Sequence, residues 1–131
     1  MLEHRLPAPV LALADRRHGE SAWRRTDLPA LAQAASAAGL ATFGGQVQIR
    51  LRSGVHELYW QDYDPTPRRP GERWPDFVDR SWKELLFLVA DLPPDDQLAA
   101  AVGEGDPAER LNGLWFVVYL EAGPGADEAG N

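Results

Sequence analysis

Residues 44–62, GGQVQIRLRSGVHELYWQD, alternate between polar and apolar side chains on both sides of the pair Ser53-Gly54. An alternation with a period of two, broken by a turn-forming pair, predicts a β-hairpin with one buried face and one face in water. If Ser53-Gly54 forms a two-residue loop, Arg50 lies opposite Glu57 on the wet face and the two form an ion pair. The hairpin therefore predicts a sheet with one face open to other molecules.

The predicted wet face carries glutamines, charged groups and a tyrosine, whereas Trp60 falls on the buried face. Tyr, Trp and Arg are the residues most enriched at the energetic centres of protein interfaces. Residues 62–75, which follow the hairpin as a proline-rich loop, add two aspartates and a tryptophan to this set. We therefore predict the following partner-binding residues: Gln48, Arg50, Glu57, Tyr59, Gln61, Asp62, Asp64 and Trp74.

The sequence on either side of the hairpin predicts two helices and a further strand. One helix has capping residues at its start and ends before Gly39, and the other begins at Pro75 and ends before Pro93-Pro94. A later apolar run is typical of a strand that is covered on both faces. The predicted fold class is α+β, an antiparallel sheet with the central hairpin at about 45–62 and a C-terminal strand at about 114–121, packed by helices at about 27–38 and 75–91.

The two ends of the chain give weaker patterns. Residues 9–14 are interpreted as a first strand and residues 21–25 as its return strand, although Ala and Leu also suit a helix. Residues 122–131 are rich in Gly, Ala and acidic groups, which predicts a disordered acidic tail. Residues 1–121 would then form a single globular α+β domain, as the length of 131 residues allows.

Charge and composition narrow the classes of partner. The net charge is −7, and residues 61–131 contribute −9 of it, with six basic and fifteen acidic side chains. Such a chain is poorly suited to nucleic acid, whose phosphates require Lys and Arg, and is better suited to a basic protein. No apolar run approaches the roughly 20 residues that span a bilayer, so we expect no membrane contact and a cytoplasmic location.

No catalytic or metal-binding motif is present in the sequence. The chain lacks Cys, and His4, His18 and His56 are scattered without a metal-ligand spacing. No serine lies in a nucleophile elbow, and Asp62 and Asp64 are interpreted as turn formers. We therefore predict no catalytic residues, no metal and no cofactor. Lys83 is the single lysine among thirteen basic residues, a bias that we attribute to coding composition.

The leading hypothesis for function is a non-catalytic protein-binding module. In size and charge alone, the chain is similar to bacterial toxin-neutralising (immunity) proteins, which would act by steric and electrostatic occlusion of a basic partner. One alternative is a small-molecule-binding domain or small enzyme with a site between the polar sheet face and the 62–75 loop. Another is a homodimer formed through Phe87 or through a sheet edge.

Overall fold

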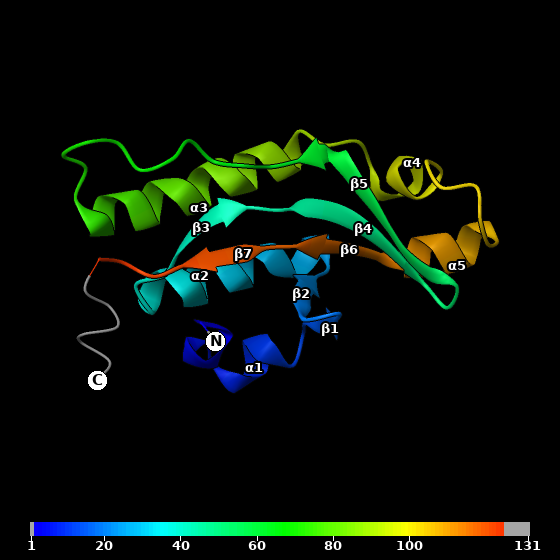
Figure 1. Cartoon of the computed structure of the whole chain (residues 1–131), viewed down its shortest axis with the longest axis horizontal. Helices are drawn as coiled ribbons and strands as arrows, with labels where there is room; N and C mark the ends of the chain where they lie inside the picture. Colours follow the sequence, from blue (N-terminus) through cyan, green and yellow to red (C-terminus); the bar gives the residue numbers. More distant parts are fainter. Residues whose placement is uncertain (1, 125–131) are drawn as a thin grey trace.

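The computed structural model describes residues 2–124 and shows the α+β architecture that the sequence predicts (Figure 1). The helices and helical turns are η1 (Leu2–Arg5), α1 (Ala8–Leu11), η2 (Arg25–Asp27), α2 (Leu28–Ala37), α3 (Trp74–Ala90), α4 (Asp95–Ala99) and α5 (Pro107–Asn112). The strands are β1 (Asp15–Arg17), β2 (Glu20–Trp23), β3 (Ala41–Gly44), β4 (Gln46–Leu51), β5 (Gly54–Asp62), β6 (Leu114–Val117) and β7 (Tyr119–Glu121).

The strands form a five-stranded antiparallel sheet in the order β1-β2-β6-β4-β5 and a two-stranded sheet of β3 and β7. Strand β3 leads directly into β4, and β6 leads directly into β7. The pair β3–β7 therefore continues the pair β4–β6 of the larger sheet. The predicted C-terminal strand is therefore present, but it is interrupted at Val118. The predicted hairpin corresponds to β4 and β5.

Tyr63 closes the gap between the two sheets. Its side chain is fully buried, and its hydroxyl lies 2.9 Å from the carbonyl oxygen of Gln46 and 2.7 Å from that of Val117. Both carbonyls lie at strand ends, where the regular hydrogen bonds between strands stop. The Tyr63 hydroxyl therefore supplies a donor in place of the missing backbone N–H groups. The chains approach closely here, because a Cβ atom on Gly45 would lie 1.8 Å from the Val117 oxygen.

Helices α2 and α3 pack against the apolar face of the sheet, as the periodicity of their sequences predicts (Figure 1). The indole N–H of Trp82 in α3 donates to the carbonyl oxygen of Leu40 at 2.7 Å, which ties the helix to the segment that leads into β3. Helices α4 and α5 lie at the end of the sheet where β4 turns into β5. The buried face of α3 consists of Phe77, Val78, Ser81, Trp82, Leu85 and Val89.

The predicted hairpin register is wrong by two residues. The turn falls at Arg52-Ser53, so Arg50 pairs with Val55 and not with Glu57. A slip of two leaves each side chain on its original face, which is why the hairpin itself is correctly predicted. The expected ion pair between Arg50 and Glu57 is consequently absent, and Gln48 lies opposite Glu57.

At the two ends of the chain, the N-terminal segment differs in part from the sequence-based expectations, and most of the expected tail lies outside the described residues. The strand expected at residues 9–14 is wrong, because Ala8–Leu11 form a helix. The return strand expected at residues 21–25 is present as β2, and the turn before it lies at His18-Gly19, where both residues have positive φ, 54° and 77°. Of the expected tail, residues 125–131 lie outside the part that the structure describes. Within residues 2–124, no helix has the length and apolar character needed to cross a membrane.

Candidate functional site

The predicted polar face is not a single open surface. Gln48 and Arg50 are only 1% and 7% exposed, so the expectation that they face water is wrong. The Arg50 guanidinium donates to the Gln48 side-chain oxygen at 3.0 Å and to the carboxylate of Asp15 at 2.7 Å. It also donates to the backbone carbonyl oxygens of Asp15 and Glu20, at 2.9 and 3.2 Å.

Curling of the sheet explains this burial. Two strands separate β1 from β4 in the sheet order, yet Asp15 of β1 contacts Arg50 of β4. The first hairpin therefore folds over the polar side of β4. The Gln48 amide donates to the carboxylates of Glu20 and Glu57, at 3.1 Å each. These polar groups bind one another, so we assign Gln48 and Arg50 a structural role.

The exposed part of the predicted site is a bulge on β5. Leu58 pairs with Val47 and Asp62 pairs with Gln46, so three β5 residues have no counterpart on β4. A bulge twists the strand locally, so that its side chains no longer alternate regularly between the two faces of the sheet. Trp60, which was predicted to be buried, is therefore 56% exposed.

Trp60 lies beside Tyr59, which is 72% exposed. The two rings meet edge to face, with centroids 5.3 Å apart and planes at 85°. Strand β5 pairs with β4 on one side only and forms an edge of the sheet. We call this surface the aromatic bulge; it comprises Glu57, Tyr59, Trp60, Gln61 and Asp62.

Asp64 and Trp74 have contacts of a different kind. The Asp64 carboxylate accepts the backbone N–H of Gly45 at 3.1 Å. Partial burial and nearby Asp62 raise the pKa of Asp64, and the hydrogen bond from Gly45 opposes that rise. The Trp74 indole donates to the carbonyl oxygen of Gly39 at 2.8 Å. Both side chains thus anchor the ends of the 62–75 loop.

The middle of that loop is attached to α3 through Arg80. The Arg80 guanidinium forms an ion pair with Glu72 at 2.7 Å, contacts Glu84, and donates to the carbonyl oxygens of Thr66 and Pro67. The groups proposed for a small-molecule site therefore face different neighbours, since the loop is bound to α3 while Arg50 is bound to the first hairpin.

Acidification should remove the contribution of Glu72 to stability. The hydrogen bond from Arg80 lowers the pKa of Glu72 to about 2, below the roughly 4.3 of an unfolded chain. The carboxylate therefore stabilises the fold fully above that unfolded value and loses its effect as pH falls toward 2. We expect Glu72→Gln to be less stable than wild type at pH 7 and equal to it near pH 2, measured by urea unfolding. A difference that persists undiminished at low pH would contradict this assignment.

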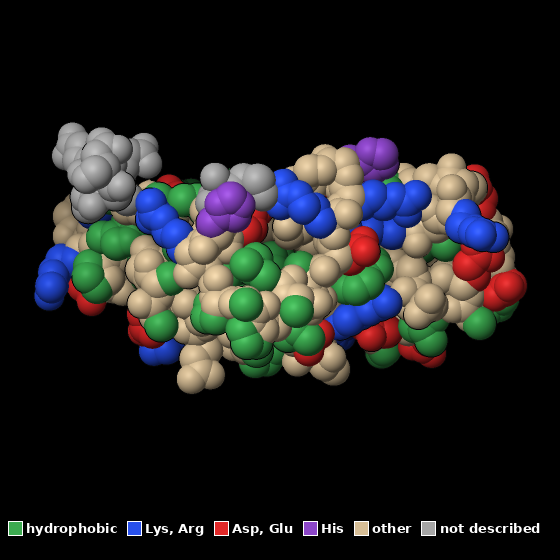
Figure 2. Space-filling view, turned by 90° about the horizontal axis from the view of Figure 1, so that it is seen from below, with side chains coloured by type: hydrophobic (Ala, Val, Ile, Leu, Met, Phe, Trp, Pro, Cys, Tyr) green, Lys and Arg blue, Asp and Glu red, His purple; other side chains and the backbone are tan. Residues whose placement is uncertain are grey.

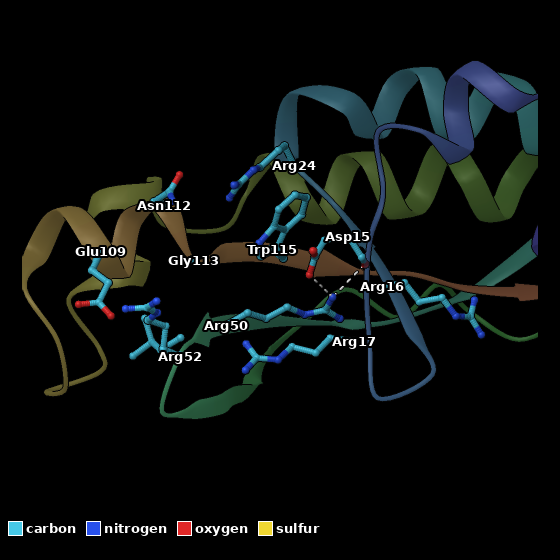
Figure 3. Close-up of a pocket in the computed structure, with 11 residues that line it drawn as sticks. Asp15, Arg16, Arg17, Arg24, Arg50, Arg52, Glu109, Asn112, Gly113 and Trp115 are labelled. Atoms are coloured by element: carbon cyan, nitrogen blue, oxygen red, sulfur yellow. Dashed lines mark hydrogen bonds and ion pairs between the residues drawn. The ribbon is translucent and has the colours of Figure 1, made fainter.

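A second surface feature, an arginine pocket, lies at the hairpin end of the sheet. The cavity has a volume of about 670 Å³, and five of its lining residues are arginines. Figure 3 shows them converging from β1, β4, the β4–β5 turn and the segment after β2, with Arg16 pointing aside. Seen from below, several basic side chains lie on this face of the molecule, with acidic side chains among them (Figure 2). The lining arginines are Arg16, Arg17, Arg24, Arg50 and Arg52.

Sequence reasoning missed this pocket because its residues come from separate segments. The signal available was the excess of Arg over Lys, which we attributed to coding composition. Arg24 lies over the ring of Trp115, 3.6 Å from its centroid, and donates to the carbonyl oxygen of Leu114 at 2.6 Å. Burial lowers the pKa of Arg24, and nearby carboxylates, first among them Asp15, oppose this shift.

Comparison with protein-family models, curated proteins and solved structures finds no match for this chain. Within residues 2–124, no group of three or more His, Asp or Glu side chains is placed to hold a metal ion. The aromatic bulge and the arginine pocket are the two surface features of this protein that suggest binding of another molecule.

Proposed function

We propose that the protein is a non-catalytic binding module that docks another protein through the aromatic bulge. The observation that carries this proposal is the pair of adjacent, largely exposed rings, Tyr59 and Trp60, on an edge strand. Exposed large apolar side chains that lie together mark interaction surfaces more often than isolated ones do. Tyr and Trp also combine a large contact area with few rotatable bonds, which suits them to the centre of an interface.

The charge around the bulge favours a basic partner. Glu57 and Asp62 lie at its two ends, and both are exposed. The whole chain carries a net charge of −7. Such a surface accelerates encounter with a positively charged protein, and salt weakens that attraction. Occlusion of a basic active site, as in a toxin-neutralising protein, is the form of this function that we propose.

Replacing both rings should weaken docking strongly. We expect Tyr59→Ala/Trp60→Ala to weaken the complex by about 30-fold or more, since hot-spot residues contribute about 2 kcal/mol or more. The partner would be captured from lysate of the source organism at low salt, identified by mass spectrometry, purified, and titrated by calorimetry. We expect a 1:1 complex with a basic protein whose association rate falls as salt rises.

Phe87 provides a matched control, because it is 74% exposed but lies on α3. Phe87→Ala should bind the partner as wild type does. Unchanged affinity of the double variant, with its melting temperature preserved, would refute docking at the bulge. If Phe87→Ala alone weakened binding, the interface would lie on α3. A stable dimer of the free protein, lost in the double variant, would show that the bulge binds a second copy of this chain.

A further inference from the structure

We propose that the arginine pocket is a binding site for a small molecule that carries two or more phosphate or carboxylate groups. This site lies apart from the aromatic bulge and does not depend on the docking proposed there. The lining includes five arginines and two carboxylates, those of Asp15 and Glu109, and it keeps an excess of positive charge even without Arg16, which points aside (Figure 3). A local excess of positive charge is unusual in a chain whose total charge is −7.

Three of the five arginines already have partners. The buried Arg50 donates to Asp15, Glu20 and Gln48, so its guanidinium forms part of the pocket wall. Arg24 is held over Trp115, and Arg16 donates to the hydroxyl of Ser21 at 3.2 Å. These contacts fix the wall of the cavity before any ligand arrives, and such preorganisation lowers the cost of binding.

Arg17 and Arg52 are the groups available to a ligand. Among the residues that the structure describes, neither side chain has a hydrogen bond or an ion pair. They extend from β1 and from the β4–β5 turn along the same cavity (Figure 3). Guanidinium groups match phosphate and carboxylate oxygens in a two-pronged geometry, and an anion placed between two of them relieves their mutual repulsion.

Volume and charge favour a compact ligand over a polymer. About 670 Å³ falls within the range of small-molecule sites. A nucleic acid would extend beyond the pocket onto a surface that is acidic overall, and it gains affinity only where phosphates meet basic groups. Trp115, which is half-buried in the lining, adds an apolar wall beside the cationic groups.

Calorimetric titration of the full chain at low ionic strength tests the site with two probes, pyrophosphate and citrate. We expect one-to-one binding of at least one of them. The variant Arg17→Ala/Arg52→Ala should weaken it by on the order of 100-fold, about tenfold for each charged contact. A preference for pyrophosphate would identify a phosphate ligand, and a preference for citrate would identify a carboxylate ligand.

The matched control is Arg69→Ala/Arg73→Ala, which removes the same charge from the 62–75 loop. Both side chains there are exposed. This control should bind the probe as wild type does. Equal weakening in both double variants would show that total charge, and not the pocket, governs binding, and would overturn the proposal. Absence of binding by both probes at millimolar concentration would also overturn it. Because the tested arginines lack side-chain partners, we expect their removal to leave the melting temperature unchanged.

Discussion

Replacing Gly45 with alanine should lower the free energy of unfolding by about 3 kcal/mol, which corresponds to a melting temperature roughly 10 °C lower. The added Cβ would lie 1.8 Å from the carbonyl oxygen of Val117 and 3.3 Å from the ring of Tyr63. The oxygen belongs to the backbone of the neighbouring strand, so no side-chain rotation can relieve the contact. The strands would have to separate where the Tyr63 hydroxyl bonds to both of them.

Urea unfolding followed by tryptophan fluorescence measures this effect. Gly103→Ala is the control, because a Cβ on Gly103 meets nothing within 4 Å. We expect its stability to stay within about 0.5 kcal/mol of wild type. A Gly45→Ala variant as stable as this control would show that the strands can separate at the junction without cost.

Replacing Arg50 with methionine should also lower the free energy of unfolding by about 3 kcal/mol. Methionine retains much of the apolar stem but supplies no donor. The side-chain oxygen of Gln48 would then lose a partner in a buried place, and the carbonyl oxygens of Asp15 and Glu20 would lose one in a partly buried place. The Asp15 side chain is 41% exposed, so its carboxylate can be hydrated instead, which limits the loss of stability.

Arg52→Met is the control for this experiment, since Arg52 lies two residues away in the same hairpin and is exposed. We expect it to change stability by less than about 0.5 kcal/mol. Equal effects of the two substitutions would show that charge in the hairpin matters and that the buried network does not. Stability of Arg50→Met equal to that of wild type would mean that water replaces the guanidinium.

The periodic elements could be predicted because their signals are local. The alternation at 45–62 predicts β4 and β5, and the apolar stripe at 75–91 predicts α3. Gly39 and Pro93-Pro94 mark where α2 and α3 end, since each residue restricts the backbone at its own position. The register of the hairpin is less determined, because a slip of two residues preserves both faces.

The candidate surfaces depended on contacts between distant segments. Trp60 is exposed because β4 lacks residues opposite the bulge, and Arg50 is buried because the first hairpin folds over it. The arginine pocket joins side chains from β1, β4 and the turn between β4 and β5, with Arg17 and Arg52 separated by more than thirty positions. No window of sequence contains these relations.

The sequence by itself determined the α+β class, the positions of the main helices and strands, and the faces that the core side chains occupy. These follow from hydrophobic period and from the backbone limits of Gly and Pro, which act over a few residues. Only the tertiary structure decided which polar groups stay in water. Curling of the sheet buries Gln48 and Arg50, and it also gathers the arginines around one cavity. These outcomes depend on how strands that are distant in the sequence pack against one another, and the local sequence pattern does not determine that packing.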